Sequence, residues 1–468
     1  MSRSSRMVTW DSIHLHLPSE PSFTYNGWMD RLKEKQKIIA AATAEILVAA
    51  ANSDADFPHA ILHVDGDGFF VSCELARRPD LRGRAAVTGE ERGIATSMNP
   101  GAKALGITRG MRTRDIRRYY PQVVILPSDY RMYRQYARRM YEIVRSVAGL
   151  VEEYSIDECF ADLTRVRRAP GVTYEDLART IQAELHQSLG ITFSVGLGVN
   201  KVMAKVASKW RKPAGITVIG KGAIREFLRE LPIGKVWGIG SSTTIYLRKQ
   251  GITTALDLAQ KDRMWVREHC DKPLAEIYEE LQGNFVKELG IVARMPKSIQ
   301  DTATFYPPTS DPAQLWSELS CHVEDACARL RGQGLLASHA SFFIKTQSFS
   351  YIRGEAKLPD LSAEPDRILA AIRPHFETLF LPNIAYRATG ISLSGICTAE
   401  SCTFSLFAPP ARLTASRIVH ETIDRLSRRF GKNSVFLGSS LRALRTNTRR
   451  RAERMERAID IIYLGKVG

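Results

Sequence analysis

Two short stretches, each with carboxylates beside a hydrophobic segment, most tightly constrain how this chain can fold. In the first, an apolar run over 60–64 ends directly at Asp65. In the second, Asp157 and Glu158 stand next to each other in a segment that we expect to form one strand over 153–162. Carboxylates near a hydrophobic core cost free energy unless a cation pairs with them. Both stretches are therefore expected to face cations.

The three carboxylates suit a magnesium site. Mg²⁺ prefers oxygen ligands and is commonly shared with substrate phosphates, and two such ions stabilise the attacking and leaving oxygens of an in-line phosphoryl displacement. An isolated Asp-x-Asp is more often a turn or a cap, and an Asp-Glu pair is more often a solvated face. The flanking residues must therefore decide between these interpretations.

Those flanking residues resemble the Y-family translesion DNA polymerases, and most closely their DinB (DNA polymerase IV) branch. The matching segments are HVDGDGFFVSCE at 63–74, EEYSIDECFADLT at 152–164, SVGLGVNKVMAKVASKWRKPAGITVI at 194–219 and LPIGKVWGIG at 231–240. They follow the family's order and approximate spacing. The resemblance implies a low-fidelity, template-directed DNA polymerase for translesion synthesis, which transfers a nucleotidyl group from a dNTP to the primer 3′-hydroxyl.

The resemblance also implies a multidomain α/β and α+β fold shaped as a right hand. Its parts are a palm, small fingers, a helical thumb with a helix-hairpin-helix, and a little-finger domain. The expected boundaries are an N-terminal extension with a helix at 1–57, palm at 58–68 and 129–220, fingers at 69–128, thumb at 221–294, little finger at 295–400 and a basic C-terminal tail at 401–468. Helices are expected over 130–147 and 174–189, and a strand, helix, two strands, helix and strand over 295–400.

Composition agrees with a nucleic-acid partner. The 468 residues carry a net charge of +16, and 44% of them are hydrophobic, as in a soluble globular protein. The seven cysteines lack metal-site spacing and are expected to be reduced thiols. Without a signal-peptide core or a transmembrane run, we expect a cytoplasmic monomer that binds primer–template DNA and dNTPs and no membrane.

The resemblance assigns the catalytic metal ligands. They are Asp65, Asp157 and Glu158, with the Gly66 carbonyl as a fourth donor to two Mg²⁺ ions, for which Mn²⁺ can substitute. Asp67 also matches a family aspartate but is better interpreted as a hydrogen-bonded structural carboxylate.

The nucleotide pocket is expected to use five further residues. Phe70 matches the steric gate that excludes a 2′-hydroxyl, although it can also be a core phenylalanine, and Phe69 packs beneath the site. Lys212 matches the family lysine that contacts the triphosphate. In the fingers, Ser97 and Lys103 fall near the second triphosphate contact, but the family tyrosine is missing there, and lysine offers a point charge instead of a bidentate fork.

The DNA contacts are predicted at two places. Gly238, Gly240 and Ser241 form a hairpin whose amides can face a phosphate without reading sequence. Lys201 and Lys205 are one helical turn apart. They have two interpretations: they face DNA or phosphate, or they are solvated lysines.

Three segments near the ends of the chain keep two interpretations each. A helical stretch at 28–52 either packs on the body of the enzyme or clasps DNA. The segment at 403–407 resembles a sliding-clamp motif ending in Leu406 and Phe407, but it lacks the leading glutamine and can be a linker. The basic stretch at 425–457 is either a disordered, solvated tail or a phosphate-binding arm whose affinity falls with salt.

Two rival functions remain. A non-catalytic, polymerase-like adaptor would recruit partners to DNA, yet such relatives usually lose the carboxylates that this chain keeps. A nucleotidyl cyclase has a palm-like core, but it needs neither a hairpin nor a little finger.

Overall fold

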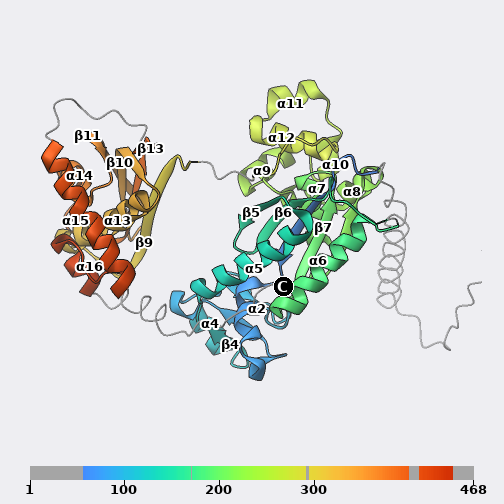
Figure 1. Cartoon of the computed structure of the whole chain (residues 1–468), viewed down its shortest axis with the longest axis horizontal. Coiled ribbons are helices and arrows are strands. Elements are labelled where there is room, and N and C mark those ends of the chain that lie inside the picture. The colour runs from blue at the N-terminus through green and yellow to red at the C-terminus, as the bar shows by residue number, and fades with distance from the viewer. Residues whose placement is uncertain (1–55, 170, 291–294, 400–409, 446–468) are drawn as a thin grey trace, which may run out of the picture. The chain divides into compact units, whose positions relative to one another are not determined.

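A computed structural model describes residues 56–169, 171–290, 295–399 and 410–445, with side chains from 416 onward in the last range. The chain forms two compact units (Figure 1). Among the described residues, the first unit contains 56–67 together with 140–289, and the second contains 68–139 together with those from 290 to 445. The helical stretch expected at 28–52 and the segment at 403–407 lie outside the described residues.

A five-stranded sheet forms the centre of the first unit. Its order is β5 (Val151–Ser155), β6 (Glu158–Asp162), β1 (Ile61–Gly66), β7 (Phe193–Gly198) and β8 (Ile216–Ile219). The central strand β1 runs antiparallel to both β6 and β7, whereas β7 and β8 are parallel. Every residue of β1 is buried, including the polar His63 and Asp65, so the strand does not alternate between buried and exposed positions.

The expected single strand over 153–162 is wrong. Two strands form there instead, β5 and β6, and Ser155 pairs with Glu158 across a turn at Ile156 and Asp157. A two-residue connection is the shortest common hairpin loop. Asp157 therefore lies in the turn, and only Glu158 lies in a strand.

Two helices pack on this sheet. The expected helix α6 (Tyr174–Leu189) is confirmed, and a reciprocal capping box between Thr173 and Asp176 fixes its start. Helix α7 (Lys201–Trp210) begins at Asn200, whose side chain accepts a hydrogen bond from the Met203 amide. Figure 1 shows α6 beside β7.

Glycines in β7 let α7 approach the sheet closely. A Cβ atom added at Gly196 would lie 2.1 Å from the Ser208 amide nitrogen, and one at Gly198 would lie 2.4 Å from the Ala204 nitrogen. Both distances are far shorter than any real carbon–nitrogen contact, so only glycine fits at these positions.

Five further α-helices belong to the described part of the first unit. They are α8 (Ile224–Glu230), α9 (Ser241–Lys249), α10 (Ala255–Ala259), α11 (Arg263–His269) and α12 (Lys272–Leu281). Thr254, Asp262 and Asp271 cap the last three with side-chain oxygens. Asn200 joins this group to α7, because its amide donates to the carbonyls of Glu280 and Asn284 at 2.7 and 2.9 Å.

The N-terminal part of the second unit is small. A three-stranded sheet in the order β3 (Ser97–Met98), β2 (Ala86–Thr88) and β4 (Val124–Leu126) packs with α2 (Phe69–Ala76), α3 (Pro100–Ala104) and α4 (Thr113–Tyr119). Helix α5 (Tyr130–Ala148), expected over 130–147, follows β4 and leads into the first unit.

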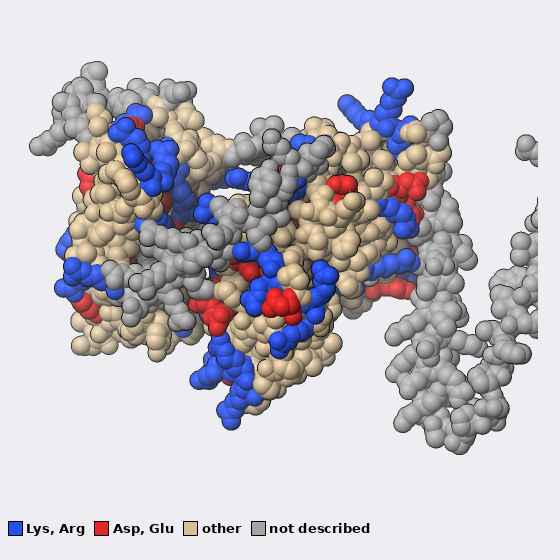
Figure 2. Space-filling model, turned by 60° about the horizontal axis from the view of Figure 1, so that its bottom comes forward, with Lys and Arg blue, Asp and Glu red and all other residues tan. Residues whose placement is uncertain are grey.

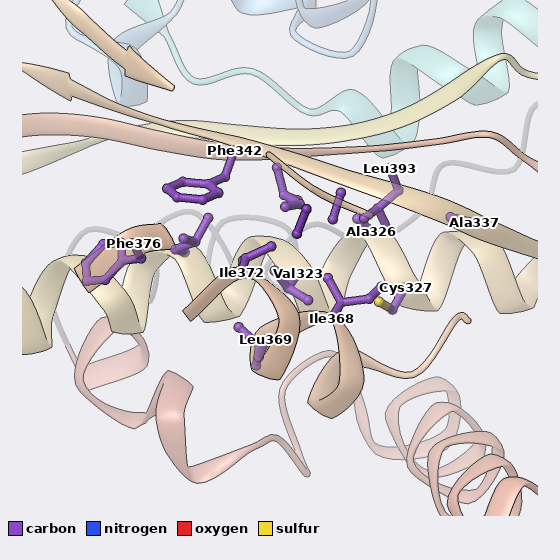
Figure 3. Packing of buried hydrophobic residues seen from close by; sticks show 14 of the residues in the cluster. Val323, Ala326, Cys327, Ala337, Phe342, Ile368, Leu369, Ile372, Phe376 and Leu393 are labelled. Carbon is purple, nitrogen blue, oxygen red and sulfur yellow. The ribbon is translucent and has the colours of Figure 1, made fainter. Parts of the chain in front are cut away.

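The C-terminal part of the second unit has the expected order of strand, helix, two strands, helix and strand. Its antiparallel sheet runs β11 (Tyr351–Ser362), β10 (Leu335–Thr346), β12 (Tyr386–Ser394) and β9 (Ser298–Thr309), and the short β13 (Cys397–Thr398) pairs with β10. Helices α13 (Pro312–Gly332) and α14 (Pro365–Leu379) cover one face. Figure 3 shows Val323 and Ile372 from the two helices packed beneath Phe342 and Leu393 of the sheet.

The disordered alternative for the basic C-terminal stretch is wrong where the structure describes that stretch. Helix α15 (Pro410–Phe430) and the short α16 (Leu441–Arg445) form there, and α16 packs against α13. Arg331 holds Asp424 through two hydrogen bonds of 2.7 and 2.8 Å. Ala443 is fully buried, and its amide donates to Ser317 at 3.0 Å.

The cysteines partly differ from expectation. Cys73, Cys159, Cys270, Cys321 and Cys327 are free thiols. Cys397 is disulfide-bonded, so the expectation of reduced thiols is wrong for this residue. Among the described residues, no helix is long and apolar enough to cross a membrane.

Candidate active site

Strand pairing brings the three predicted carboxylates together at one end of the strands of the first unit's sheet. Asp65 and Glu158 are direct partners in the register of β1 and β6. Side chains that face each other across an antiparallel pair lie on the same face of the sheet. The Gly66 amide donates to the Asp157 carbonyl at 2.9 Å, which fixes the turn beside them.

Asp65 is buried against a cation. Only 6% of the residue is exposed, and the Lys212 ammonium is hydrogen-bonded to its Oδ1 oxygen. Burial raises the pKa of Asp65 to about 6, with a smaller rise from Glu158, while Lys212 opposes the increase. The charged form of Asp65 is therefore costly, and a cation at this position stabilises it.

The neighbouring carboxylates each have one oxygen held by the protein. Lys205 Nζ lies 2.6 Å from Glu158 Oε2. The Ser155 hydroxyl donates to Asp157 Oδ1 at 2.7 Å, and the Tyr141 hydroxyl donates to the Ser155 carbonyl at 2.6 Å. Neither Ser155 nor Tyr141 was predicted from the sequence, because a serine in a turn and a helical tyrosine carry no signal of this role.

Lys201 and Lys205 are not solvated, so that alternative is wrong. They are 6% and 4% exposed, and Lys201 pairs with Glu152 at 2.6 Å. Their spacing on α7 turns both toward the sheet. A contact of either lysine with DNA stays a prediction.

Asp67 has a different environment from Asp65. Its carboxylate accepts from the Ser194 hydroxyl at 2.7 Å and from the Ala214 amide at 2.8 Å, and Lys212 Nζ lies 3.6 Å away. These bonds tie the end of β1 to β7 and to the loop after α7. Asp67 therefore braces the backbone that carries Asp65.

The donor set fits hard divalent cations. Within the described part of the chain, no three His, Cys, Asp or Glu side chains already form a metal-binding group. The side-chain donors here are carboxylate oxygens. The ammonium groups of Lys212 and Lys205 contact these oxygens, which shows that the carboxylates stabilise cations at these positions. Asp65, Asp157 and Glu158 would hold such ions if the ions replaced part of this lysine pairing.

The second unit contains the predicted aromatic residues of the nucleotide pocket. Phe69 is 2% exposed and lies in the core, whereas Phe70 is only partly buried. The Phe70 ring stacks on Tyr133 at 4.6 Å with an angle of 13° between the planes, and Tyr130 meets its edge at 5.4 Å. Phe70 therefore has a fixed orientation.

A buried polar network supports that stack, and sequence reasoning missed it. The Tyr133 hydroxyl donates to Glu74 at 2.7 Å, and the Asp129 amide donates to the same oxygen at 3.3 Å. Burial raises the pKa of Glu74. A glutamate 59 residues from its tyrosine partner gives no recognisable sequence signal.

The segment over 97–104, predicted to lie in the fingers, is a strand followed by a capped helix. Ser97 in β3 is buried. Its hydroxyl oxygen accepts a weak hydrogen bond from the Val71 amide nitrogen, 3.5 Å away. Asn99 caps α3 by accepting from the Ala102 amide at 3.0 Å. Lys103 is exposed in the last turn of that helix. A triphosphate contact of Ser97 or Lys103 stays a prediction.

The predicted hairpin is an exposed turn before α9. Gly238 has a φ of 91°, a left-handed conformation that favours glycine, and Gly240 occupies the N-cap without a side-chain hydrogen bond. Gly238, Gly240 and Ser241 are all exposed.

Figure 2 shows that lysine and arginine side chains gather in several groups on the face in view, with fewer acidic side chains between them.

Family models match most of the described chain. The impB/mucB/samB family matches residues 64–209, its C-terminal domain matches 296–406, and the helix-hairpin-helix motif of the same family matches 221–252.

Curated relatives and solved structures agree with these matches. DNA polymerase IV of Desulfatibacillum aliphaticivorans is 28% identical over 80% of this chain and 95% of its own length. DNA polymerase IV of Neisseria meningitidis serogroup B is 30% identical over 62% of this chain and 92% of its own length. A Y-family DNA polymerase chimera is similar in fold, with a TM-score of 0.61 and 22% identity over 72% of this chain and 99% of the chimera.

Proposed function

This chain belongs to the impB/mucB/samB family, as a Y-family DNA polymerase of the DNA polymerase IV kind, and we propose that Asp65, Asp157 and Glu158 form its catalytic metal site. The enzyme is a DNA-directed DNA polymerase that binds DNA and dNTPs. We further propose that it extends primers across damaged template bases, as the resemblance implies for a translesion enzyme.

Two divalent metal ions, Mg²⁺ by preference, would supply charge stabilisation for the attacking primer oxygen and the leaving pyrophosphate. Asp65 and Glu158, opposite each other on β1 and β6, would hold them with Asp157 and the Gly66 carbonyl. Ser155 and Lys205 each restrain one oxygen of these carboxylates, which limits how far the ligands can turn. Positioning of this kind is the main contribution of a protein to phosphoryl transfer.

Lys212 would move its charge from Asp65 to the triphosphate when a nucleotide enters. It is one-third exposed and already contacts Asp65, so its ammonium needs only a rotamer change to reach a phosphate bound beside that carboxylate. Phe70 would act as the steric gate, supported by its stack on Tyr133. Phe69, Ser97 and Lys103 complete the proposed nucleotide contacts.

The domain assignment is likewise a proposal. We assign the palm to 58–68 and 129–220, the fingers to 69–128, the thumb to 221–294 and the little finger to 295–400. Helix-hairpin-helix glycines that face a phosphate backbone would hold the duplex. A sliding clamp would bind Leu406 and Phe407, and loss of clamp pull-down in the double alanine variant would test this contact. Light scattering would test whether the enzyme is a monomer.

The opposed pair of the buried Asp65 and the half-buried Glu158, each in contact with a lysine, is the observation that carries the metal-site proposal. Primer extension with Mg²⁺ and four dNTPs should be compared between the wild type and Asp157→Asn/Glu158→Gln. Glu153→Gln is the matched control, because Glu153 is an exposed carboxylate in the same hairpin that pairs with Arg145 at 3.0 Å.

We expect extension by the wild type and by the control, and no extension by the double variant, which should still bind DNA. Extension by the double variant at the wild-type rate would place the metal site elsewhere. If the wild type binds DNA but adds no nucleotide with any divalent metal, the adaptor function replaces the polymerase. Templates with a damaged base would then test translesion synthesis.

A further inference from the structure

Three aromatic rings of the first unit gather beside the catalytic carboxylates. Tyr154 comes from β5, Phe160 from β6, and Trp237 from the loop directly before the hairpin turn. The Trp237 ring meets Tyr154 edge to face at 5.4 Å and 89°, and its indole nitrogen donates to the Tyr154 hydroxyl at 3.1 Å. Phe160 lies 5.5 Å from both rings. We call this group the aromatic box.

Two lysines of α7 place their ammonium groups against the aromatic box. Lys205 Nζ lies 4.2 Å from the centroid of Tyr154, 5.0 Å from Trp237 and 5.8 Å from Phe160. Lys201 Nζ lies 4.8 Å from Phe160 and 5.8 Å from Trp237. The electron-rich face of an aromatic ring attracts a cation within about 6 Å, most strongly when water is excluded. The two lysines are almost fully buried, so this attraction is not screened by solvent.

Lys205 therefore has two kinds of partner at once. Its ammonium lies 2.6 Å from Glu158 Oε2, and the same ammonium rests among the three rings. The rings fix where the ammonium sits, and the ammonium fixes one oxygen of Glu158. Lys205 holds Glu158 through Oε2, so Oε1 is the oxygen that a metal ion would approach.

The aromatic box also joins two functional regions. Trp237 immediately precedes Gly238, whose left-handed backbone begins the hairpin that we assign to the duplex. A shift of the hairpin would move Trp237, and Trp237 contacts the ammonium that holds Glu158. The contacts therefore form an unbroken chain from the hairpin to the metal site.

We propose that Lys205 is a positioning residue for the polymerase reaction, held in place by the aromatic box, and that it couples Trp237 and the duplex hairpin to Glu158. This role rests on the proposed metal site. It predicts that a change at Trp237, a residue without a carboxylate or a metal contact, weakens the use of Mg²⁺ at Glu158.

The test compares Trp237→Leu, which removes the aromatic face, with Trp237→Phe, which keeps it. The measured quantity is the Mg²⁺ concentration for half-maximal primer extension at saturating DNA. Trp237→Leu should raise it about fivefold, which corresponds to a cation–π contact of about 1 kcal/mol, whereas Trp237→Phe should change it less. Trp265→Leu is the matched control, because Trp265 also carries a lysine, Lys261, at 5.2 Å and lies on α11 away from the box.

A double-mutant comparison isolates Lys205 from a general loss of packing. Lys205→Met removes the charge, and we expect Trp237→Leu to add almost nothing to it, because both changes break the same contact. Lys205→Arg should restore part of the Mg²⁺ response. Additive effects would mean that the box acts on stability alone and would overturn the proposal.

A titration without catalysis separates this proposal from the proposed function. Mg²⁺ should change the tryptophan fluorescence of the wild type, and the change should vanish in Trp237→Phe and shrink in Lys205→Met. This signal would persist even if the protein extended no primer, in which case only the proposed function fails. Wild-type Mg²⁺ dependence in Trp237→Leu, with weaker DNA binding alone, would show that Trp237 serves the duplex and not Glu158.

Discussion

Neutralising Asp65 is expected to stabilise the metal-free protein while it disables the proposed catalytic site. Asp65 is 6% exposed, and burial raises its pKa from 3.8 to about 6 despite the contact with Lys212. The folded protein therefore binds a proton on Asp65 more tightly than the unfolded chain does. Asp65→Asn removes the charge that burial disfavours and keeps the shape of the side chain.

The magnitude follows from the two pKa values. One pKa unit corresponds to about 1.4 kcal/mol, so a carboxyl that titrates near 6 when folded and near 3.8 when unfolded costs about 3 kcal/mol of unfolding free energy at pH 7.5. The cost is fully present above pH 6.5 or so and falls to about 1.5 kcal/mol at pH 5, because the folded carboxyl is then protonated. Asp65→Asn should thus gain most stability at high pH.

The assay is urea unfolding in a chelator at pH 5 and pH 7.5, with hydrogen exchange of the β1 peptide as the probe of the first unit. Asp67→Asn is the matched control, since Asp67 accepts from Ser194 and Ala214 and its loss should destabilise the fold. Added Mg²⁺ should stabilise the wild type more than Asp65→Asn. The reasoning would be refuted if Asp65→Asn were no more stable than the wild type at pH 7.5, or if its gain in unfolding free energy did not shrink at pH 5.

Three other predictions follow from the packing and contacts of the two units. Gly196→Ala should lower the free energy of unfolding by about 3 kcal/mol or more, as in an overpacked core. The new methyl group would lie 2.1 Å from the Ser208 amide nitrogen, and thermal unfolding measures the loss. Phe70→Ala should increase ribonucleotide incorporation by the polymerase, and unchanged discrimination in single-nucleotide insertion would argue against the steric gate. Asp424→Asn should loosen α15, because Arg331 holds that carboxylate in two hydrogen bonds; limited proteolysis within α15 should become faster, and an unchanged cleavage rate would contradict this.

The sequence predicts best where local signals and burial agree. The helix α6 has an apolar stripe and a Thr173–Asp176 capping box, and its predicted bounds are the observed ones. The order of elements over 295–400 is also as predicted, because its strands alternate and its helices start with proline. Here each residue's preference can be judged from its near neighbours.

The sequence predicts less well where distant contacts decide the structure. The hairpin of β5 and β6 resembles one continuous strand in sequence, whereas the pairing of β5 with β6 sets Ser155 opposite Glu158 and the pairing of β6 with β1 sets Glu158 opposite Asp65. The basic stretch that begins at 425 has the charge of a solvated tail, yet Ser317 binds the Ala443 amide within it and Arg331 binds Asp424 directly before it. These partners lie about 90 residues or more away, at 93 and 126 positions, and no local pattern contains them.

Two lysines explain why the proposed catalytic carboxylates can stand in this core before any metal arrives. An unpaired carboxylate in an apolar site is strongly disfavoured, whereas pairing with a cation offsets part of the free-energy cost of burying it. Lys205 compensates Glu158 and Lys212 compensates Asp65, and both lysines follow β7, which pairs with β1. The two lysines are nevertheless unequal, since Lys212 is 33% exposed and Lys205 is 4% exposed within the aromatic box. We therefore propose that Lys212 turns to a triphosphate once a metal ion compensates Asp65, while Lys205 is confined, so the same compensation yields one mobile charge and one fixed charge.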